Sequence, residues 1–217
     1  MRRLVLPLVL CLSSACATEK SHVLDTQEVE SYGTAYSGPI TPIAVGKVAN
    51  ASPYMRGIFT TGDQLGSQAK TILKTHLTQT GRFDVVDRDN LEEIGFESQT
   101  SGVNQSLVGA KYVVTGEVTE FGRKETGDHQ LFGILGRGKK QIAYSKVALN
   151  VVDVTTSRIV YAVQGAGEYE LSSREIVGTG GTQGYDSTLN GKVLNLSIAN
   201  AVNKLVRDVE NGIVALQ

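Results

Sequence analysis

Apolar and polar positions along this chain follow two periods, one typical of β-strands and the other typical of α-helices. Runs that alternate, or that are rich in β-branched residues, predict strands. These runs cover residues 40–48, 83–86, 109–121, 141–154 and 158–171. Apolar residues that recur at every third or fourth position predict helices, over residues 63–79, 90–96 and 189–214. The predicted element order is therefore β-α-β-α-β-β-β-α.

Residues at the ends of these elements predict where helices begin and end and where turns and loops lie. Gly81 follows the first helix, as glycine commonly does at a helix C-terminus. Either Asp89 or Asn90 is placed to cap the second helix. Residues 155–157 predict a turn that joins the last two strands into an antiparallel hairpin. Polar or glycine-rich stretches predict loops, over residues 50–62, 97–104 and 172–185.

Hairpins and crossovers occur together in this order, which favours an α+β domain. We expect a mixed sheet in a three-layer, α/β/α-like arrangement with room for extra β-hairpins. The 217 residues are enough for one sizeable domain and a tether.

The amino terminus has the parts of a bacterial export signal. Arg2 and Arg3 precede an apolar run, residues 4–12, and small residues then lead to Cys16. A cysteine directly after small residues predicts lipoprotein processing, in which residues 1–15 are removed and Cys16 carries acyl chains such as palmitate. The alternative of a transmembrane anchor requires about 20 apolar residues, more than this run supplies.

The residues after the cysteine bear on location and spacing. Ala17 stands where an aspartate often marks retention in the inner membrane of enteric bacteria, so we expect an outer-membrane anchor with the domain facing the periplasm. Residues 16–39 are polar and predict a lipidated tether. Residues 40–217 are the predicted domain. The alternative is that part of the polar stretch is a first strand packed on that domain.

The net charge argues against one class of function, nucleic-acid binding, and the cysteine content argues against a disulfide. The formal net charge of the whole chain is −1, from 21 lysines and arginines against 22 acids. Removal of residues 1–15 takes away Arg2 and Arg3, which leaves 19 basic residues and a net charge of −3. Such a chain lacks the basic footprint of a nucleic-acid-binding protein, and we expect no nucleic-acid partner. The only cysteines are Cys11 and Cys16, so the mature domain has no disulfide.

Two glycine-rich runs suggest anion binding, and each has a plainer interpretation. Residues 133–139 fit the G-x-x-x-x-G-K pattern of a phosphate-binding loop, but Lys140 stands where a magnesium-binding serine or threonine is required. The pattern also runs into a predicted strand, whereas a phosphate loop opens a helix. Residues 178–184 lack the preceding strand of such a unit. We expect loops at both places.

The acidic residues and histidines do not predict a metal-binding or catalytic site either. Asp84, Asp87 and Asp89 are close in sequence, but Asp84 and Asp87 would point to opposite faces of a strand, and acids at a helix start commonly cap it. The histidines are scattered over the predicted tether, a helix and a loop, without the spacing of a zinc site: His22, His76 and His129. No G-x-S-x-G nucleophile motif occurs. We therefore expect no catalytic residues, no enzyme activity, no cofactor and no metal.

One segment resembles a known family. The run from Gly81 to Ile94 (GRFDVVDRDNLEEI) is similar to the curli-secretion-channel (CsgG) family, which includes HfaB-like proteins. Four further stretches fit in the same order: residues 43–45, 109–121, 149–160 and 199–206. The resemblance covers residues 40 to 214.

The resemblance implies an outer-membrane lipoprotein whose periplasmic domain assembles into rings of identical subunits and has no enzyme activity. In the curli channel, each subunit also donates two β-hairpins to a transmembrane pore that exports amyloid-forming subunits. The corresponding regions here are residues 121–149 and 158–185. The first has a highly charged outgoing arm over residues 122–128, and the second has a weak returning arm.

Three functional hypotheses follow. The first is a ring-forming, non-enzymatic component of a curli-type secretion or surface-assembly apparatus, with exported subunits or other lipoproteins as partners. The second is a lipoprotein of the same fold that forms no pore and supports another envelope machine, such as polysaccharide export or cell-wall synthesis. The third, a nucleotide-dependent enzyme, rests on residues 133–140 alone.

Overall fold

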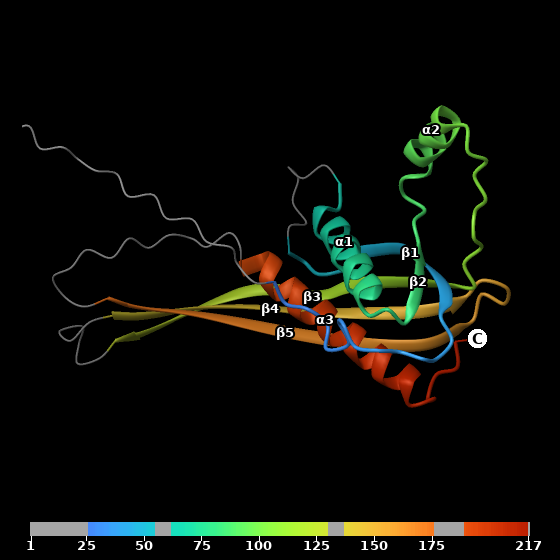
Figure 1. Ribbon diagram of the computed structural model, residues 1–217. Coiled ribbons are helices and arrows are strands. Elements are labelled where there is room, and N and C mark those ends of the chain that lie inside the picture. Colours follow the sequence, from blue (N-terminus) through green and yellow to red (C-terminus); the bar gives the residue numbers. More distant parts are fainter. Residues whose placement is uncertain (1–25, 55–61, 130–136, 176–188, 217) are drawn as a thin grey trace, which may run out of the picture.

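The computed structural model describes residues 26–54, 62–129, 137–175 and 189–216. Its elements follow the predicted order, and the α+β class with a mixed sheet is confirmed (Figure 1). The strands are β1 (Thr41–Asn50), β2 (Phe83–Val86), β3 (Tyr112–His129), β4 (Arg137–Asp153) and β5 (Ile159–Glu175). The helices are α1 (Gln64–Gln79), α2 (Leu91–Ser101) and α3 (Leu189–Glu210).

The five strands form one sheet in the order β2-β1-β3-β4-β5. β1 lies parallel to both β2 and β3, because α1 and α2 carry the chain back between these strands. The pairs β3–β4 and β4–β5 are antiparallel. The predicted turn joins β4 to β5: Asp153 accepts hydrogen bonds from the backbone N and the hydroxyl of Thr156, at 2.7 and 2.8 Å.

Helices α1 and α3 lie side by side on one face of the sheet, α1 over β1 and α3 over β4 and β5 (Figure 1). The core lies between them and the sheet, with Leu73, Leu149 and Ile198 among its fully buried side chains. α2 lies apart from both layers (Figure 1). The described residues therefore form two layers rather than the expected three, because neither packed helix covers the second face.

Two glycines of β5 let α3 approach the sheet closely. A Cβ at Gly165 would lie 2.1 Å from the backbone oxygen of Ser197, and one at Gly167 would lie 2.8 Å from the backbone nitrogen of the same residue. Backbone atoms cannot move aside as a side-chain end can, so only glycine fits at this helix–strand contact.

The antiparallel strands are longer than predicted. β3 continues beyond Phe121 to His129, and the predicted loop over residues 172–185 begins as four further residues of β5. Together with β4, these arms form a three-stranded ribbon that runs past the helices (Figure 1). Cross-strand hydrogen bonds satisfy the backbone whatever the side chains are, which explains how the charged arm 122–128 extends as a strand.

Helix boundaries also differ in detail. Asp63, the first residue of the predicted helix, is the N-cap of α1, and its carboxylate accepts a 2.8 Å hydrogen bond from the backbone N of Gly66. Gly81 has a left-handed backbone, with φ of 64°, after that helix. α2 continues beyond Phe96 to Ser101, into the predicted loop 97–104, and ends at Gly102 with φ of 69°. α3 ends at Glu210 rather than at 214.

Candidate functional site

The segment that carries the family resemblance, residues 81–94, spans the turn after α1, strand β2 and the first turn of α2. It is therefore the connection between the packed domain and the helix that lies apart from it. Its charged side chains make two sets of contacts, one to α1 and the other to the N-terminal segment.

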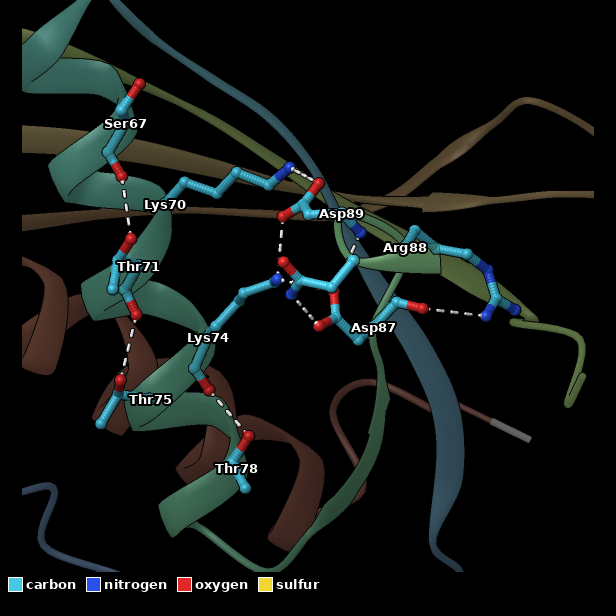
Figure 2. Close-up of polar contacts among 10 residues, drawn as sticks. Ser67, Lys70, Thr71, Lys74, Thr75, Thr78, Asp87, Arg88 and Asp89 are labelled. Atoms are coloured by element: carbon cyan, nitrogen blue, oxygen red, sulfur yellow. Dashed lines mark hydrogen bonds and ion pairs between the residues drawn. The ribbon is translucent and has the colours of Figure 1, made fainter. Parts of the chain in front are cut away.

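The first set ties the β2–α2 loop to α1 (Figure 2). Lys74 reaches both carboxylates of the loop, at 2.9 Å to Asp87 Oδ1 and 2.8 Å to Asp89 Oδ2. Lys70 lies 2.5 Å from Asp89 Oδ1. These lysines stand one helical turn apart on α1, so both ammonium groups face the same loop. Asp87 and Asp89 therefore form ion pairs with lysines of α1, and their role is structural.

Hydrogen bonds and charge together hold the pKa values of these acids below their usual range. For Asp87 the causes are the backbone N–H of Asp89, the side-chain amide of Asn90 and then Lys74. For Asp89 the causes are the bonds from Lys70 and Lys74. Asn90 occupies the N-cap position of α2 but makes no side-chain capping bond, because its amide donates to Asp87 instead. The predicted side-chain cap of α2 is therefore wrong.

Beyond this loop, residues 90–109 form what we call the α2 arm. None of the residues of α2 is buried. Five large apolar side chains of the arm are more than two-fifths exposed: Ile94, Phe96, Val103, Leu107 and Val108. Phe96, at 67%, is the most exposed of them. The Arg88 guanidinium donates to the backbone oxygen of Val108, which closes the arm on itself at its base.

The second set of contacts centres on Arg82, whose side chain is only 5% exposed. Its Nε donates to Glu210 Oε1 at 2.8 Å, at the end of α3. Its Nη1 donates to the backbone oxygens of Thr80 and Thr34, at 2.6 and 3.1 Å, and its Nη2 donates to Thr34 Oγ1 at 2.7 Å. The guanidinium also lies 5.0 Å from the ring centre of Tyr36. A planar fork with five donors can make such a set of bonds, and an ammonium cannot.

Arg82 thus holds the N-terminal strap, our name for residues 26–36. Val29 of the strap is buried in the core, and the backbone N of Glu30 donates to Asn203 Oδ1 of α3 at 3.0 Å. These residues belong to the predicted tether, and they pack on the domain, as the alternative interpretation of that stretch allowed. They do so without forming a strand.

A groove with a volume of about 690 Å³ lies between α1 and α3 and is lined in part by the strap. We call it the α1–α3 groove. Its lining residues include Ile72, Leu196 and Tyr169, together with Thr26 and Gln27 of the strap. Apolar atoms make up most of its surface.

His76 lies buried at the strap end of this groove. Asn195 donates Nδ2 to the backbone oxygen of Gln27 at 3.2 Å, which turns its Oδ1 toward His76 Nε2 at 2.6 Å. Nε2 therefore carries a hydrogen, and Nδ1 lies 3.2 Å from the amide of Gln79. His76 of α1 thus binds Asn195 of α3, which in turn binds Gln27 of the strap.

The other residues singled out by the sequence either lie outside the described residues or are found elsewhere in the described fold. Cys16, His22 and residues 178–184 lie outside the described residues, as does the first part of the G-x-x-x-x-G-K run. The end of that run, residues 137–139, was expected to be a loop before a strand that starts at residue 141, but it forms the start of β4. His129 ends β3, and Asp84 is exposed on β2. Among the residues that the structure describes, no group of acids, histidines and cysteines is arranged to hold a metal ion.

Arg82, Lys70 and Lys74 form contacts that the sequence did not predict. Lysines one turn apart are common on the exposed face of a helix, so their spacing does not indicate a contact with another element. Arg82 lies directly before strand β2, next to the buried Phe83. A charged residue at this position was the only feature of the sequence that indicated a buried contact of Arg82. No helix of the described chain has the length and apolar character needed to cross a membrane.

Comparisons with known proteins agree with the resemblance. A family model described as curli production assembly/transport component CsgG matches residues 34–216. A protein of Neisseria meningitidis serogroup B (strain ATCC BAA-335 / MC58), provisionally named lipoprotein NMB1126/NMB1164, is 63% identical over 200 residues. That match covers 92% of this chain and 90% of the relative.

Two solved structures are similar at lower identity. The PelC dodecamer from Paraburkholderia phytofirmans is 16% identical, with a TM-score of 0.36, and the match covers 77% of this chain and 93% of that one. Lipoprotein GNA1162 from Neisseria meningitidis is 16% identical, with a TM-score of 0.35, and the match covers 80% and 97% of the two chains. At these scores neither likeness bears on function.

Proposed function

We propose a function on the premise that this chain belongs to the family of the curli production assembly/transport component CsgG. In this proposal it is a lipoprotein of the outer membrane, acylated at Cys16, with its domain in the periplasm. Copies of the chain assemble into a ring that serves, without catalysis, in secretion or surface assembly. The family match and the relative that is named a lipoprotein support the proposal.

The exposed α2 arm is the observation that carries the assembly part of the proposal. Apolar surface that leaves water contributes about 25 cal/mol per Å² to association, and five large apolar side chains of the arm are 41–67% exposed in the described part of the chain. Monomeric soluble proteins rarely expose large contiguous apolar patches, and five such side chains within the 20 residues of one arm favour a contact with another protein. The ion pairs of Lys70 and Lys74 orient the arm, so that it can meet a neighbouring subunit in one defined geometry.

The assembly is tested with full-length protein extracted in detergent. Native mass spectrometry and electron microscopy are expected to find rings for the wild type and monomers for Phe96→Asp, with an unchanged circular dichroism spectrum. The matched control is Ile213→Asp, because Ile213 is 69% exposed but follows α3. Rings of Phe96→Asp, or a wild type that is monomeric at micromolar concentration, would refute the proposed interface.

Planar-bilayer conductance of the same particles separates the two envelope roles. A large, stable conductance from ring-shaped particles is expected of a subunit that itself exports cargo. Intact rings in silent bilayers would instead favour the second role, a lipoprotein that supports another envelope machine. Both roles use the same anchor and the same assembly.

A further inference from the structure

The α2 arm and the α1–α3 groove lie on opposite sides of α1. Lys70 and Lys74 point from this helix toward the loop at the base of the arm (Figure 2). Ile72, which lines the groove, stands two residues from each lysine, or about 200° around the helix. The arm therefore begins on the side of α1 that is turned away from the groove of the same subunit, and α2 lies apart from α1 and α3 (Figure 1). Each subunit thus carries two surfaces that face apart.

On α2, one aromatic ring and two carboxylates share an exposed face. Phe96 is 67% exposed, and Glu92 and Glu93 stand four and three residues before it. Residues at these spacings are neighbours on a helix surface. Both glutamates are exposed, and α2 contains no basic residue. The arm therefore presents an apolar side chain that is flanked by negative charge.

The groove has the complementary size, apolar character and charge. A cavity of about 150 Å³ can hold a benzene ring, so a groove of about 690 Å³ accepts a phenylalanine side chain together with the atoms around it. Ile72 and Leu196 contribute apolar lining. The described lining contains one lysine, Lys192, and no acidic residue. The Lys192 ammonium lies 5.2 Å from the ring centre of Tyr169, which also lines the groove.

We propose that the α2 arm of one subunit docks in the α1–α3 groove of the next, with Phe96 in the groove and Glu92 and Glu93 beside Lys192. The inference rests on the proposed ring and names the contact that builds it. Because the two surfaces differ and face apart, this contact repeats head to tail, and such an interface gives a ring when the rotation between subunits closes. A contact between two arms would instead be symmetric and would end at a dimer.

Two exposed threonines of α1 provide a matched pair of variants. Thr75 lines the groove, and Thr78 is not among its lining residues. Each hydroxyl donates to the backbone oxygen four residues earlier, so the same bond is lost in both variants. In full-length, detergent-extracted protein, native mass spectrometry is expected to find monomers for Thr75→Trp, whose indole fills the groove, and rings for Thr78→Trp. Both should keep the circular dichroism spectrum of the wild type.

Disulfide cross-linking identifies the two surfaces that meet. Thr100 follows Phe96 by four residues on the same face of α2, and Cys16 is the only other cysteine of the processed chain. Thr100→Cys combined with Thr75→Cys is expected to give interchain disulfides, seen as a ladder of dimers and larger species that dithiothreitol reverses. Thr100→Cys combined with Thr78→Cys is expected to give no ladder. An intrachain disulfide, or dimers of Thr100→Cys alone, would overturn the proposal.

Charge reversal tests the polar part of the contact. Lys192→Glu places like charges opposite each other, and we expect it to raise the protein concentration at half-assembly at least ten-fold. Adding Glu92→Lys and Glu93→Lys to the same chain is expected to restore assembly. Assembly that Lys192→Glu leaves unchanged would overturn the pairing of these charges.

The outcomes separate this contact from the proposed ring. Rings of Thr75→Trp, together with the absence of a disulfide ladder, would overturn the contact and leave the ring in place. A wild type that is monomeric at micromolar concentration would refute the ring itself.

Discussion

Replacement of Arg82 by alanine is expected to lower the free energy of unfolding by about 3 kcal/mol. The change removes the donors to Glu210, Thr80 and Thr34 from a site where the arginine side chain is 5% exposed. Truncating one member of a buried ion pair costs about 3–5 kcal/mol, and each buried carbonyl left without a donor costs about 1–3 kcal/mol. Glu210 is 39% exposed, so water can solvate it, which places the total at the lower end.

Urea denaturation followed by circular dichroism measures this loss. In a domain of this size, 3 kcal/mol corresponds to a fall in the melting temperature of about 6–12 °C. Arg207→Ala is the matched control, because Arg207 is also ion-paired but is 66% exposed, and it should cost less than about 0.5 kcal/mol. Arg82→Lys keeps the charge but lacks the planar fork, so its stability should fall between the wild type and Arg82→Ala.

A second measurement distinguishes loss of the contacts between Arg82 and the strap from destabilisation of the whole domain. If Arg82 holds the strap, amide hydrogen exchange in Arg82→Ala should accelerate in residues 26–36 at denaturant concentrations where the core of α3 remains protected. A stability loss below about 1 kcal/mol, or equal acceleration in the strap and in α3, would refute the reasoning.

Three further predictions test the loop, the helix contact and the anchor. Because the pKa values of Asp87 and Asp89 are lowered in the folded state, their stabilisation is present above the ordinary value of 3.8 and is lost as pH falls below it. Urea midpoints of the wild type should therefore drop below pH 4 more steeply than those of Asp89→Asn, and parallel curves would contradict this. Gly165→Ala should cost about 1–3 kcal/mol by pushing α3 off β5, whereas Gly95→Ala, in an open helical position, should be neutral or stabilising by up to about 1 kcal/mol; equal urea midpoints would be inconsistent with the close contact. Cys16→Ala should move the folded protein from the membrane fraction to the soluble fraction, and retention after an alkaline wash would count against an anchor made of lipid alone.

Local sequence determined most of the elements. The bounds of β2 were predicted to the residue, and Gly81 was correctly predicted to end the first helix, which Asp63 caps at its other end. These features depend on neighbouring residues alone: an apolar alternation, an acceptor before a helix and a residue without a Cβ. The resemblance of residues 81–94 likewise pointed to the family that the comparisons then established.

The candidate site was much less predictable. The sequence marked residues 81–94 but gave no partner for Arg82, because Thr34, Thr80 and Glu210 are brought together only by the packing of three segments. Nor did it show that Lys70 and Lys74 bind the loop acids, since that contact joins two elements of the folded chain.

Tertiary structure alone decided the layering and the exposure. Periodicity gave α2 an apolar side but could not say that the described chain leaves Phe96 67% exposed. The predicted strand ended at Phe121, yet residues 122–128 continue it and β4 pairs with them along their whole length. The strap looked like a polar spacer, and Val29 proved to be buried. In each case the missing information is a long-range contact, and its free energy depends on which surfaces meet rather than on the residues adjacent in sequence.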